Sequence, residues 1–310
     1  MNNLTQAIQD YLRLRQSVGF KLVQVESLLK DFGTFMAARE ASWVTTELAL
    51  QWAVQPVNGQ PEYWSKRLIA VRGFARYRSA TDPRTEIPER GLLPNRPKRA
   101  KPHLYSEEEI GNLLVAAKAL SHGTGLRGQT HYCLFGLLTV TGLRISEALA
   151  LQRRDVDLEQ GLLTIRGAKF GKSRLIPLHP STRDALAQYA SLRDATISHP
   201  VAANFLISEC GRALRPSTVR DTFCKLSRQI GLRAPKDRNG PRLHDFRHRF
   251  ATETLLRWYR AGDDVERLVP VLSTYLGHCR TSDTYWYISA CPELMGEAAR
   301  LLDKRWGAAS

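Results

Sequence analysis

Five prolines within residues 83–102 constrain this chain most, because they rule out a continuous helix and separate two helical patterns. They are Pro83, Pro88, Pro94, Pro97 and Pro102. The end of the segment is strongly basic, with Arg96, Lys98, Arg99 and Lys101. A chain of 310 residues is long enough for two domains. We therefore expect residues 83–104 to be a linker that contacts phosphates, between domains at 1–82 and 105–310.

The region before the linker has the apolar spacing of helices. We expect a helix at Leu4–Ser17, a second over residues 22–36, a third capped by Thr45 or Thr46, and a fourth opened by Pro61. The fourth helix carries five basic residues: Lys66, Arg67, Arg72, Arg76 and Arg78. A solvated surface explains each of them alone. As a group they could follow a DNA backbone.

The region after the linker predicts a second, mixed domain. Ser106 and Glu109 form a capping-box pattern at the start of a helix. Residues 162–166 and 174–178 read as two short strands of a hairpin. Further helices are expected near residues 130–140, 180–195, 216–230, 244–258, 264–275, 281–289 and 293–304. The predicted fold class is mainly α with a small antiparallel β-sheet.

Composition limits the class of partner and the cellular location that we expect for this chain. A formal charge of +15 and a pI near 9.9 favour a polyanion, although a basic protein without a nucleic-acid role remains the alternative. No apolar run approaches the roughly 18 residues of a membrane span, and the N-terminus has no secretory-signal pattern. The five cysteines form no Cys-x-x-Cys pair, so neither a disulfide framework nor a zinc site is indicated. We expect a cytoplasmic protein with reduced thiols.

Six residues after the linker together supply the groups needed to break a phosphodiester. They are Arg144, Lys169, His244, Arg247, His278 and Tyr287. Arginines bind phosphate oxygens as a fork, while histidine, lysine and tyrosine side chains can move protons or attack phosphorus. Each residue alone has a structural explanation, such as a surface arginine after a helix stop or a core tyrosine. Their order and spacing in combination indicate chemistry.

The local settings of these residues are recognisable. Gly142 and Gly277 are expected to end helices in a left-handed turn, just before Arg144 and His278. His244 and Arg247 are three apart at a helix start, so they share a face and lie where anions bind well. The neighbouring residues His248 and Arg249 are expected to point elsewhere on that helix.

The chain resembles the tyrosine recombinases of the phage integrase family. The matching stretches are Thr-Gly-Leu-Arg-Ile-Ser-Glu-Ala-Leu-Ala-Leu (141–151), Gly-Ala-Lys-Phe-Gly-Lys-Ser-Arg-Leu-Ile-Pro-Leu (167–178), Leu-His-Asp-Phe-Arg-His-Arg-Phe-Ala-Thr (243–252) and Leu-Gly-His through Tyr-Trp-Tyr (276–287). The resemblance covers essentially the whole chain. It implies a C-shaped clamp, made of a four-helix core-binding domain and a mixed α/β catalytic domain.

The resemblance also implies roles for single residues. Arg144 and Arg247 match the phosphate-binding arginines, Lys169 the general acid, and Tyr287 the nucleophile. His244 and His278 match the two histidines, and His244 is favoured as acceptor of the tyrosine proton, with the reverse assignment open. Glu147 matches a supporting acidic position, and Lys172 and Arg174 are expected to bind DNA. Arg249 occupies a position where the family often has a small hydroxyl residue.

The implied reaction is site-specific recombination through a 3′-phosphotyrosyl intermediate and a Holliday junction, without metal, ATP or another cofactor. The implied partners are double-stranded DNA with inverted-repeat core sites and three further copies of the chain, on the nucleoid. Integration, transposition or resolution of a mobile element is expected. The alternatives are a type IB topoisomerase-like relaxing enzyme and a DNA-binding protein without activity.

Three assignments stay open at this point. Lys172 competes with Lys169 in the hairpin loop, and Tyr285 competes with Tyr287, although the nine-residue step from His278 favours Tyr287. The last predicted helix shows one apolar face, made of Leu294, Ala298, Leu301 and Leu302. This face could pack on the core of its own chain or on a neighbouring protomer.

Overall fold

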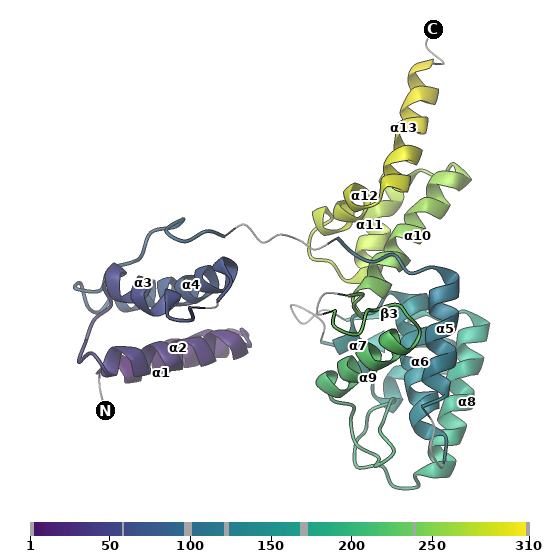
Figure 1. Cartoon of the computed structure of the whole chain (residues 1–310), viewed down its shortest axis with the longest axis horizontal. Helices are drawn as coiled ribbons and strands as arrows, with labels where there is room; N and C mark the ends of the chain where they lie inside the picture. Colours follow the sequence, from purple (N-terminus) through teal and green to yellow (C-terminus); the bar gives the residue numbers. More distant parts are fainter. Residues whose placement is uncertain are drawn as a thin grey trace. The chain divides into compact units, whose positions relative to one another are not determined.

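The computed structural model describes residues 3–57, 59–95, 101–120, 124–167, 173–237 and 240–307. Contacts divide the chain into two compact units, Met1–Ala100 and Lys101–Ser310, each with a hydrophobic core of its own (Figure 1). Some of the predicted functional residues lie outside the described part: Arg96, Lys98, Arg99, Lys169 and Lys172. What the sequence predicts for them stays a prediction.

The first unit contains the four helices predicted from apolar spacing. They are α1 (Asn3–Ser17), α2 (Val23–Ala37), α3 (Thr46–Val54) and α4 (Pro61–Arg78). Local signals set their starts: the Thr45 hydroxyl accepts a hydrogen bond from the Leu48 amide at 3.2 Å, and Pro61 opens α4. Helices α2, α3 and α4 meet around Trp52, which is fully buried and packs edge-on against Phe32.

Two of the five basic residues of α4 bond to groups within the first unit. The burial of Arg67 corrects its predicted role as a DNA contact, while that role stays a prediction for the partly buried Arg72. Arg67 is only 5% exposed, donates to the Trp52 carbonyl at 2.9 Å and lies over the indole ring. The Nε of Arg72 donates to a backbone carbonyl 16 residues further along the chain, at 2.6 Å. Lys66 and Arg76 are exposed and remain available to a polyanion.

The described part of the second unit is mostly helical with one small sheet, which confirms the predicted fold class. Its helices are α5 (Glu107–Lys118), α6 (Leu126–Thr141), α7 (Ile145–Ala150), η1 (Arg153–Asp155), α8 (Pro180–Thr196), α9 (Pro216–Gln229), α10 (Asp245–Ala261), α11 (Val265–Leu276), α12 (Ser282–Ala290) and α13 (Pro292–Gly307). The predicted capping box is present: Ser106 and Glu109 exchange hydrogen bonds at the start of α5.

The sheet is antiparallel, with strand order β1-β2-β3. Its strands are β1 (Val156–Asp157), β2 (Leu162–Ile165) and β3 (Arg174–Pro177). The pairing of β2 with β3 confirms the predicted hairpin and sets Arg174 opposite Ile165. Arg174 therefore enters the sheet at the end of the hairpin that adjoins the loop.

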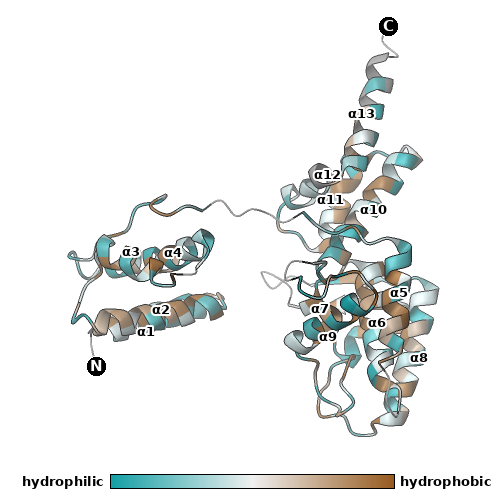
Figure 2. Cartoon of the chain, in the orientation of Figure 1, coloured by the Kyte–Doolittle hydropathy of each residue, from teal (hydrophilic) through white to brown (hydrophobic). Residues whose placement is uncertain are grey.

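The core of the second unit is built around α6. Leu134, Phe135 and Leu138 of this helix are fully buried, and α5, α8 and α10 pack against it. Figure 2 shows apolar residues concentrated along α5 and α6. A helix that is buried on several sides gives the residues at its end a rigid base.

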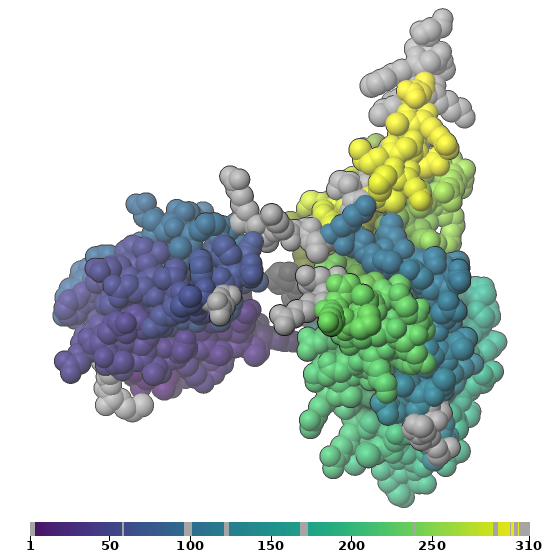
Figure 3. All heavy atoms as spheres, viewed as in Figure 1, coloured from purple at the N-terminus to yellow at the C-terminus, as the bar shows by residue number. Residues whose placement is uncertain are grey.

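A second apolar cluster joins α10 to the three helices that follow it. It includes Leu255, Val269, Tyr287 and Leu294. The start of α13 thus packs on its own chain, against α10 (Figure 3). The side chains of Ala298, Leu301 and Leu302 lie outside the described part, so the role of that face stays a prediction. None of the described helices has the length and apolar character needed to cross a lipid bilayer.

Candidate active site

Arg144 projects from a turn between two helices. α6 ends at Gly142, whose φ of 61° lies in the left-handed region, as the sequence predicted. Arg144 then forms the N-cap of α7. A Cβ at Gly142 would lie 2.6 Å from Cδ1 of Phe250, so the position also lacks room for a side chain. The turn depends on glycine for both its conformation and its space.

Replacing Gly142 by alanine should lower the free energy of unfolding by about 1–3 kcal/mol, because the new Cβ meets Phe250 and the left-handed conformation is strained. Gly111→Ala is the matched control, since this glycine lies inside α5 with no atom within 4 Å of its would-be Cβ. The control should be neutral or slightly stabilising. Urea denaturation measures both, and equal stability of the two variants would contradict the explanation.

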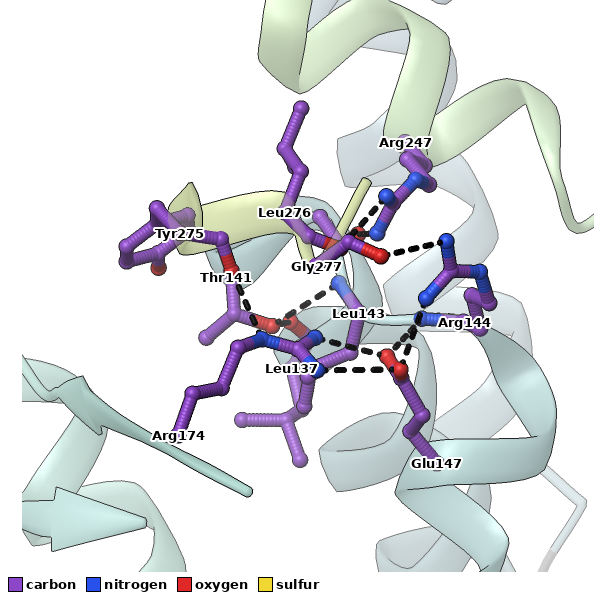
Figure 4. Close-up of polar contacts among 11 residues, drawn as sticks. Leu137, Thr141, Leu143, Arg144, Glu147, Arg174, Arg247, Tyr275, Leu276 and Gly277 are labelled. Carbon is purple, nitrogen blue, oxygen red and sulfur yellow. Dashed lines mark hydrogen bonds and ion pairs between the residues drawn. The ribbon is translucent and has the colours of Figure 1, made fainter. Parts of the chain in front are cut away.

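Glu147 links two arginines beneath this turn. Its carboxylate accepts hydrogen bonds from Arg144 Nη1 at 2.9 Å and from Arg174 Nη1 and Nη2 at 3.1 and 2.9 Å (Figure 4). It also accepts one from the Arg144 amide at 3.0 Å. Burial by itself would raise the Glu147 pKa, but the bonds from Arg174 and Arg144 outweigh it and hold the pKa below its ordinary value. Glu147 is therefore a buried carboxylate between two guanidinium groups.

Three arginines bind three successive carbonyls at the C-terminal end of α11 (Figure 4). Arg174 Nε donates to the Tyr275 carbonyl at 2.7 Å, Arg247 Nη2 to Leu276 at 2.6 Å, and Arg144 Nη2 to Gly277 at 3.1 Å. A helix C-terminus carries partial negative charge and unpaired carbonyls, which explains the attraction. The arrangement gathers three positive charges from β3, α10 and the start of α7.

Arg247 is the most deeply placed of these arginines. It is 1% exposed, and its Nη1 also donates to the Gly142 carbonyl at 2.9 Å. Burial lowers its pKa to about 10, with the nearby Tyr287 acting in the opposite direction. A guanidinium with this pKa remains protonated at neutral pH. Arg247 thus joins the ends of α6 and α11 while keeping its charge.

His244 and His278 lie near these arginines and are neutral at pH 7. His244 is an exposed residue, yet partial burial of its imidazole, followed by the charge of Arg247, lowers its pKa. Burial and then the charges of Arg247 and Arg144 lower the His278 pKa to about 4. The Nδ1 of His278 shares a hydrogen bond with the Thr284 hydroxyl at 2.7 Å, which leaves Nε2 for another partner.

Tyr287 is packed among aromatic side chains beside this basic cluster. It is 3% exposed, and its ring stacks on that of His278 with centroids 5.9 Å apart. The competing tyrosine, Tyr285, is 47% exposed and lies outside this aromatic group. The structure thus brings Tyr287 together with His278 and Arg247.

His248 was wrongly predicted to point away from the site. Its ring meets the His244 ring edge-on at 4.9 Å and the Tyr287 ring at 5.3 Å. It is 8% exposed, and within the described part of the chain its Nδ1 has no hydrogen-bond partner. The signal was available, because residues four apart on a helix lie on one face, and His248 follows His244 by one turn.

Arg249 points away from the site, as predicted, and its role is structural. Its Nε donates to the Tyr105 carbonyl at 2.7 Å, and its guanidinium forms ion pairs with Glu107 and Glu253. These contacts join α10 to the start of α5. A small hydroxyl residue could not make them, which explains the arginine in this chain.

Two further predicted DNA contacts, Lys101 and Arg174, differ in how exposed they are to solvent. Lys101 is exposed at the start of the second unit. The side chain of Arg174 is 11% exposed and its guanidinium is bound to Glu147 and the Tyr275 carbonyl, so it bonds to protein groups here and its contact with DNA stays a prediction. Its partners lie 27 and 101 residues away, beyond the reach of local pattern.

The lowered histidine pKa values predict a pH-dependent stability. Burial, followed by the charge of His244, also lowers the His248 pKa to about 4, and burial lowers that of His131 elsewhere in the unit. Below about pH 6.5 the unfolded chain binds protons that the folded chain does not, so stability is lost as the pH falls from 6.5 towards 4. Glu147 adds to the loss only below its ordinary pKa of 4.5.

Urea denaturation at pH 7.5, 6.5 and 5.5 measures this loss, which should be on the order of 1 kcal/mol or more. His248→Phe removes one of the titrating groups and should flatten the dependence. A stability that stays constant or rises as the pH falls would contradict the assignment of neutral histidines.

Comparison with known proteins places the chain in a family. The model of the phage integrase family matches residues 105–293. A protein of Sinorhizobium fredii named "Putative integrase/recombinase y4rB" is 52% identical over 99% of both chains. Tyrosine recombinase XerD of Caulobacter vibrioides is 31% identical over 75% of this chain and 72% of its own.

Among solved structures, the integrase of the transposon Tn1549, in complex with transposon right-end DNA, has a TM-score of 0.67. The match covers 96% of this chain and 98% of that one at 17% identity, and so concerns the fold alone. The sequence relatives and the matched domain establish membership. The chain belongs to the phage integrase family and is a tyrosine recombinase.

Proposed function

We propose that this recombinase cuts a DNA strand with Tyr287, leaving the DNA joined to the protein through a 3′-phosphotyrosyl bond. The bond between the tyrosine oxygen and phosphorus forms as the bond from phosphorus to the 5′-oxygen breaks, which frees a 5′-hydroxyl. The observation that carries the proposal is the meeting of Tyr287 and His278 with Arg144 and Arg247 at the end of α11. Rejoining is the same step in reverse.

In this proposal Arg144 and Arg247 hold the scissile phosphate. The Arg144 side chain is 26% exposed, so phosphate oxygens can reach it, and the buried Arg247 supplies charge where water screens it little. Both groups stabilise the negative charge that grows on the non-bridging oxygens in the transition state. These arginines can supply the charge stabilisation through their own side chains.

Two proton transfers complete the step. A neutral imidazole accepts the tyrosine proton: His244, which the sequence favours, or His278, whose ring stacks on Tyr287. Lys169 gives a proton to the departing 5′-oxygen. This last assignment depends on the family resemblance, because Lys169 lies outside the described residues.

We further propose that the substrate is double-stranded DNA of a mobile element, with inverted-repeat core sites bound by four copies of the chain. The net charge of +15 supports a DNA partner. The similarity to a relative named as an integrase/recombinase supports the mobile-element role. Strands would then be exchanged in pairs through a Holliday junction, on the nucleoid.

Recovery of bound DNA tests this function. Tyr287→Phe protein is expressed in cells, the DNA bound to it is sequenced, and a plasmid carrying two copies of the recovered site is incubated with wild-type protein. The proposal predicts recombination between the two sites. Relaxation of supercoils without recombination would instead support a topoisomerase-like enzyme. Site binding without any strand cleavage by wild-type protein would indicate a DNA-binding protein and reject the proposal.

A further inference from the structure

Arg174 directs its whole guanidinium group into the protein. Nη1 and Nη2 form a fork on the two Glu147 oxygens at 3.1 and 2.9 Å, and Nε donates to the Tyr275 carbonyl at 2.7 Å (Figure 4). All three nitrogens are therefore bound to protein groups. Two parallel hydrogen bonds of this kind fix the distance between the guanidinium and the carboxylate and hold the two groups in one plane.

Through Glu147, Arg174 also acts on Arg144. The same Glu147 carboxylate accepts from Arg144 Nη1 at 2.9 Å, so one negative charge is shared between two positive groups. The chain of guanidinium, carboxylate and guanidinium keeps a net positive charge. Without Arg174, the buried carboxylate would pair with Arg144 alone and reduce the attraction of Arg144 for a phosphate.

Arg174 acts on the end of α11 as well. It binds the first of the three carbonyls there, and the two arginines proposed to bind phosphate hold the next two. Gly277, which ends this helix just before His278, lies so close that a Cβ on it would be 2.8 Å from Arg174 Nη1. Arg174 therefore packs directly against the turn that presents His278.

We propose that Arg174 is a positioning residue for strand cleavage, which sets the place and free charge of Arg144 and the orientation of the His278 turn. This inference depends on the proposed function, in which Arg144 binds the scissile phosphate. Arg174 makes no contact with DNA in this role. When a phosphate draws Arg144 and Arg247 towards it, the bond from Arg174 to Tyr275 keeps the end of α11 in place.

A charge-neutral substrate tests the proposal. Cleavage by Arg174→Gln is measured under single turnover on a nicked duplex of the recovered site, with either a normal scissile phosphate or a methylphosphonate there. The methylphosphonate lacks the negative charge of one non-bridging oxygen, so the rate of its cleavage depends less on Arg144. We expect Arg174→Gln to slow cleavage of the phosphate by about 10–100-fold, the effect of misplacing a reacting group. On the methylphosphonate, the fold-reduction in cleavage rate caused by Arg174→Gln should be several-fold smaller. Arg144→Gln should show the same difference between the two substrates. The affinity of Arg174→Gln for DNA should equal that of the wild type.

Arg193→Gln is the matched structural control. Arg193 is also buried and binds a carboxylate, Asp194, and a backbone carbonyl, Phe205, but it lies in α8. The Arg193→Gln variant should be less stable than the wild type, but the ratio of its cleavage rates on the two substrates should be unchanged. Arg174→Lys keeps the charge, guards against a misfolded glutamine variant, and should recover part of the rate.

The outcomes separate the possible explanations. Equal losses on the two substrates would make Arg174 merely structural, and weaker DNA binding with unchanged cleavage would make it a DNA contact. Either result would overturn the proposal. Absence of a covalent product with wild-type protein on both substrates would instead reject the proposed function itself.

Discussion

Replacing Tyr287 by phenylalanine is expected to abolish covalent attachment to DNA while leaving DNA binding unchanged. Only a hydroxyl oxygen is removed from a ring that is 3% exposed, so the packing against His278 and His248 should survive. The nucleophile itself disappears, and no water-mediated route can give a protein–DNA bond. Trapping on a nicked duplex, followed by denaturing electrophoresis, measures attachment, and a gel-shift assay measures binding.

Tyr285→Phe is the matched control for this variant. Tyr285 lies two residues away on α12 and is 47% exposed, outside the aromatic group of the site. It should retain attachment at close to the wild-type rate. Attachment lost in Tyr285→Phe and kept in Tyr287→Phe would reverse the assignment of the nucleophile.

Replacing Arg247 by lysine should slow cleavage by about 10²–10³-fold, the effect of losing one preorganised donor to a developing charge. Lysine keeps the charge but cannot reproduce the planar fork that reaches the Gly142 and Leu276 carbonyls. A buried carbonyl left without a partner also costs about 1–3 kcal/mol, so the variant should unfold more readily. Single-turnover cleavage and urea denaturation measure the two effects separately.

The control is Arg257→Lys, which makes the same change at an exposed position of the same helix. It should cleave and unfold like the wild type. Wild-type cleavage by Arg247→Lys would remove Arg247 from the phosphate site, whatever the effect on stability.

Helices and turns could be predicted because their signals are local. Apolar spacing, the Ser106 capping box and the glycines at 142 and 277 each act within a few residues, and the structure has the corresponding helices and left-handed turns. The hairpin followed from two short apolar strands around a polar loop. Fold class and family were accessible for the same reason.

The direction of each basic side chain could not be predicted in this way. Arg67 and Arg174 look like surface charges in the sequence, but they satisfy the Trp52 carbonyl and the buried Glu147. Such partners are set by how helices and strands pack, and they lie 15 and 27 residues away. His248 is different, because its spacing of one helical turn from His244 already places the two rings on one face.

The measurement that tests the central claim most directly is the location of the DNA link on the protein. Covalent complex formed on the nicked duplex is digested with nuclease and trypsin and sequenced by mass spectrometry. Cleavage after Arg280 and Arg300 releases one peptide, residues 281–300, which contains both Tyr285 and Tyr287. Fragment ions that place the phosphate on Tyr287 are predicted, and a phosphate on Tyr285 or on any other residue would contradict the account.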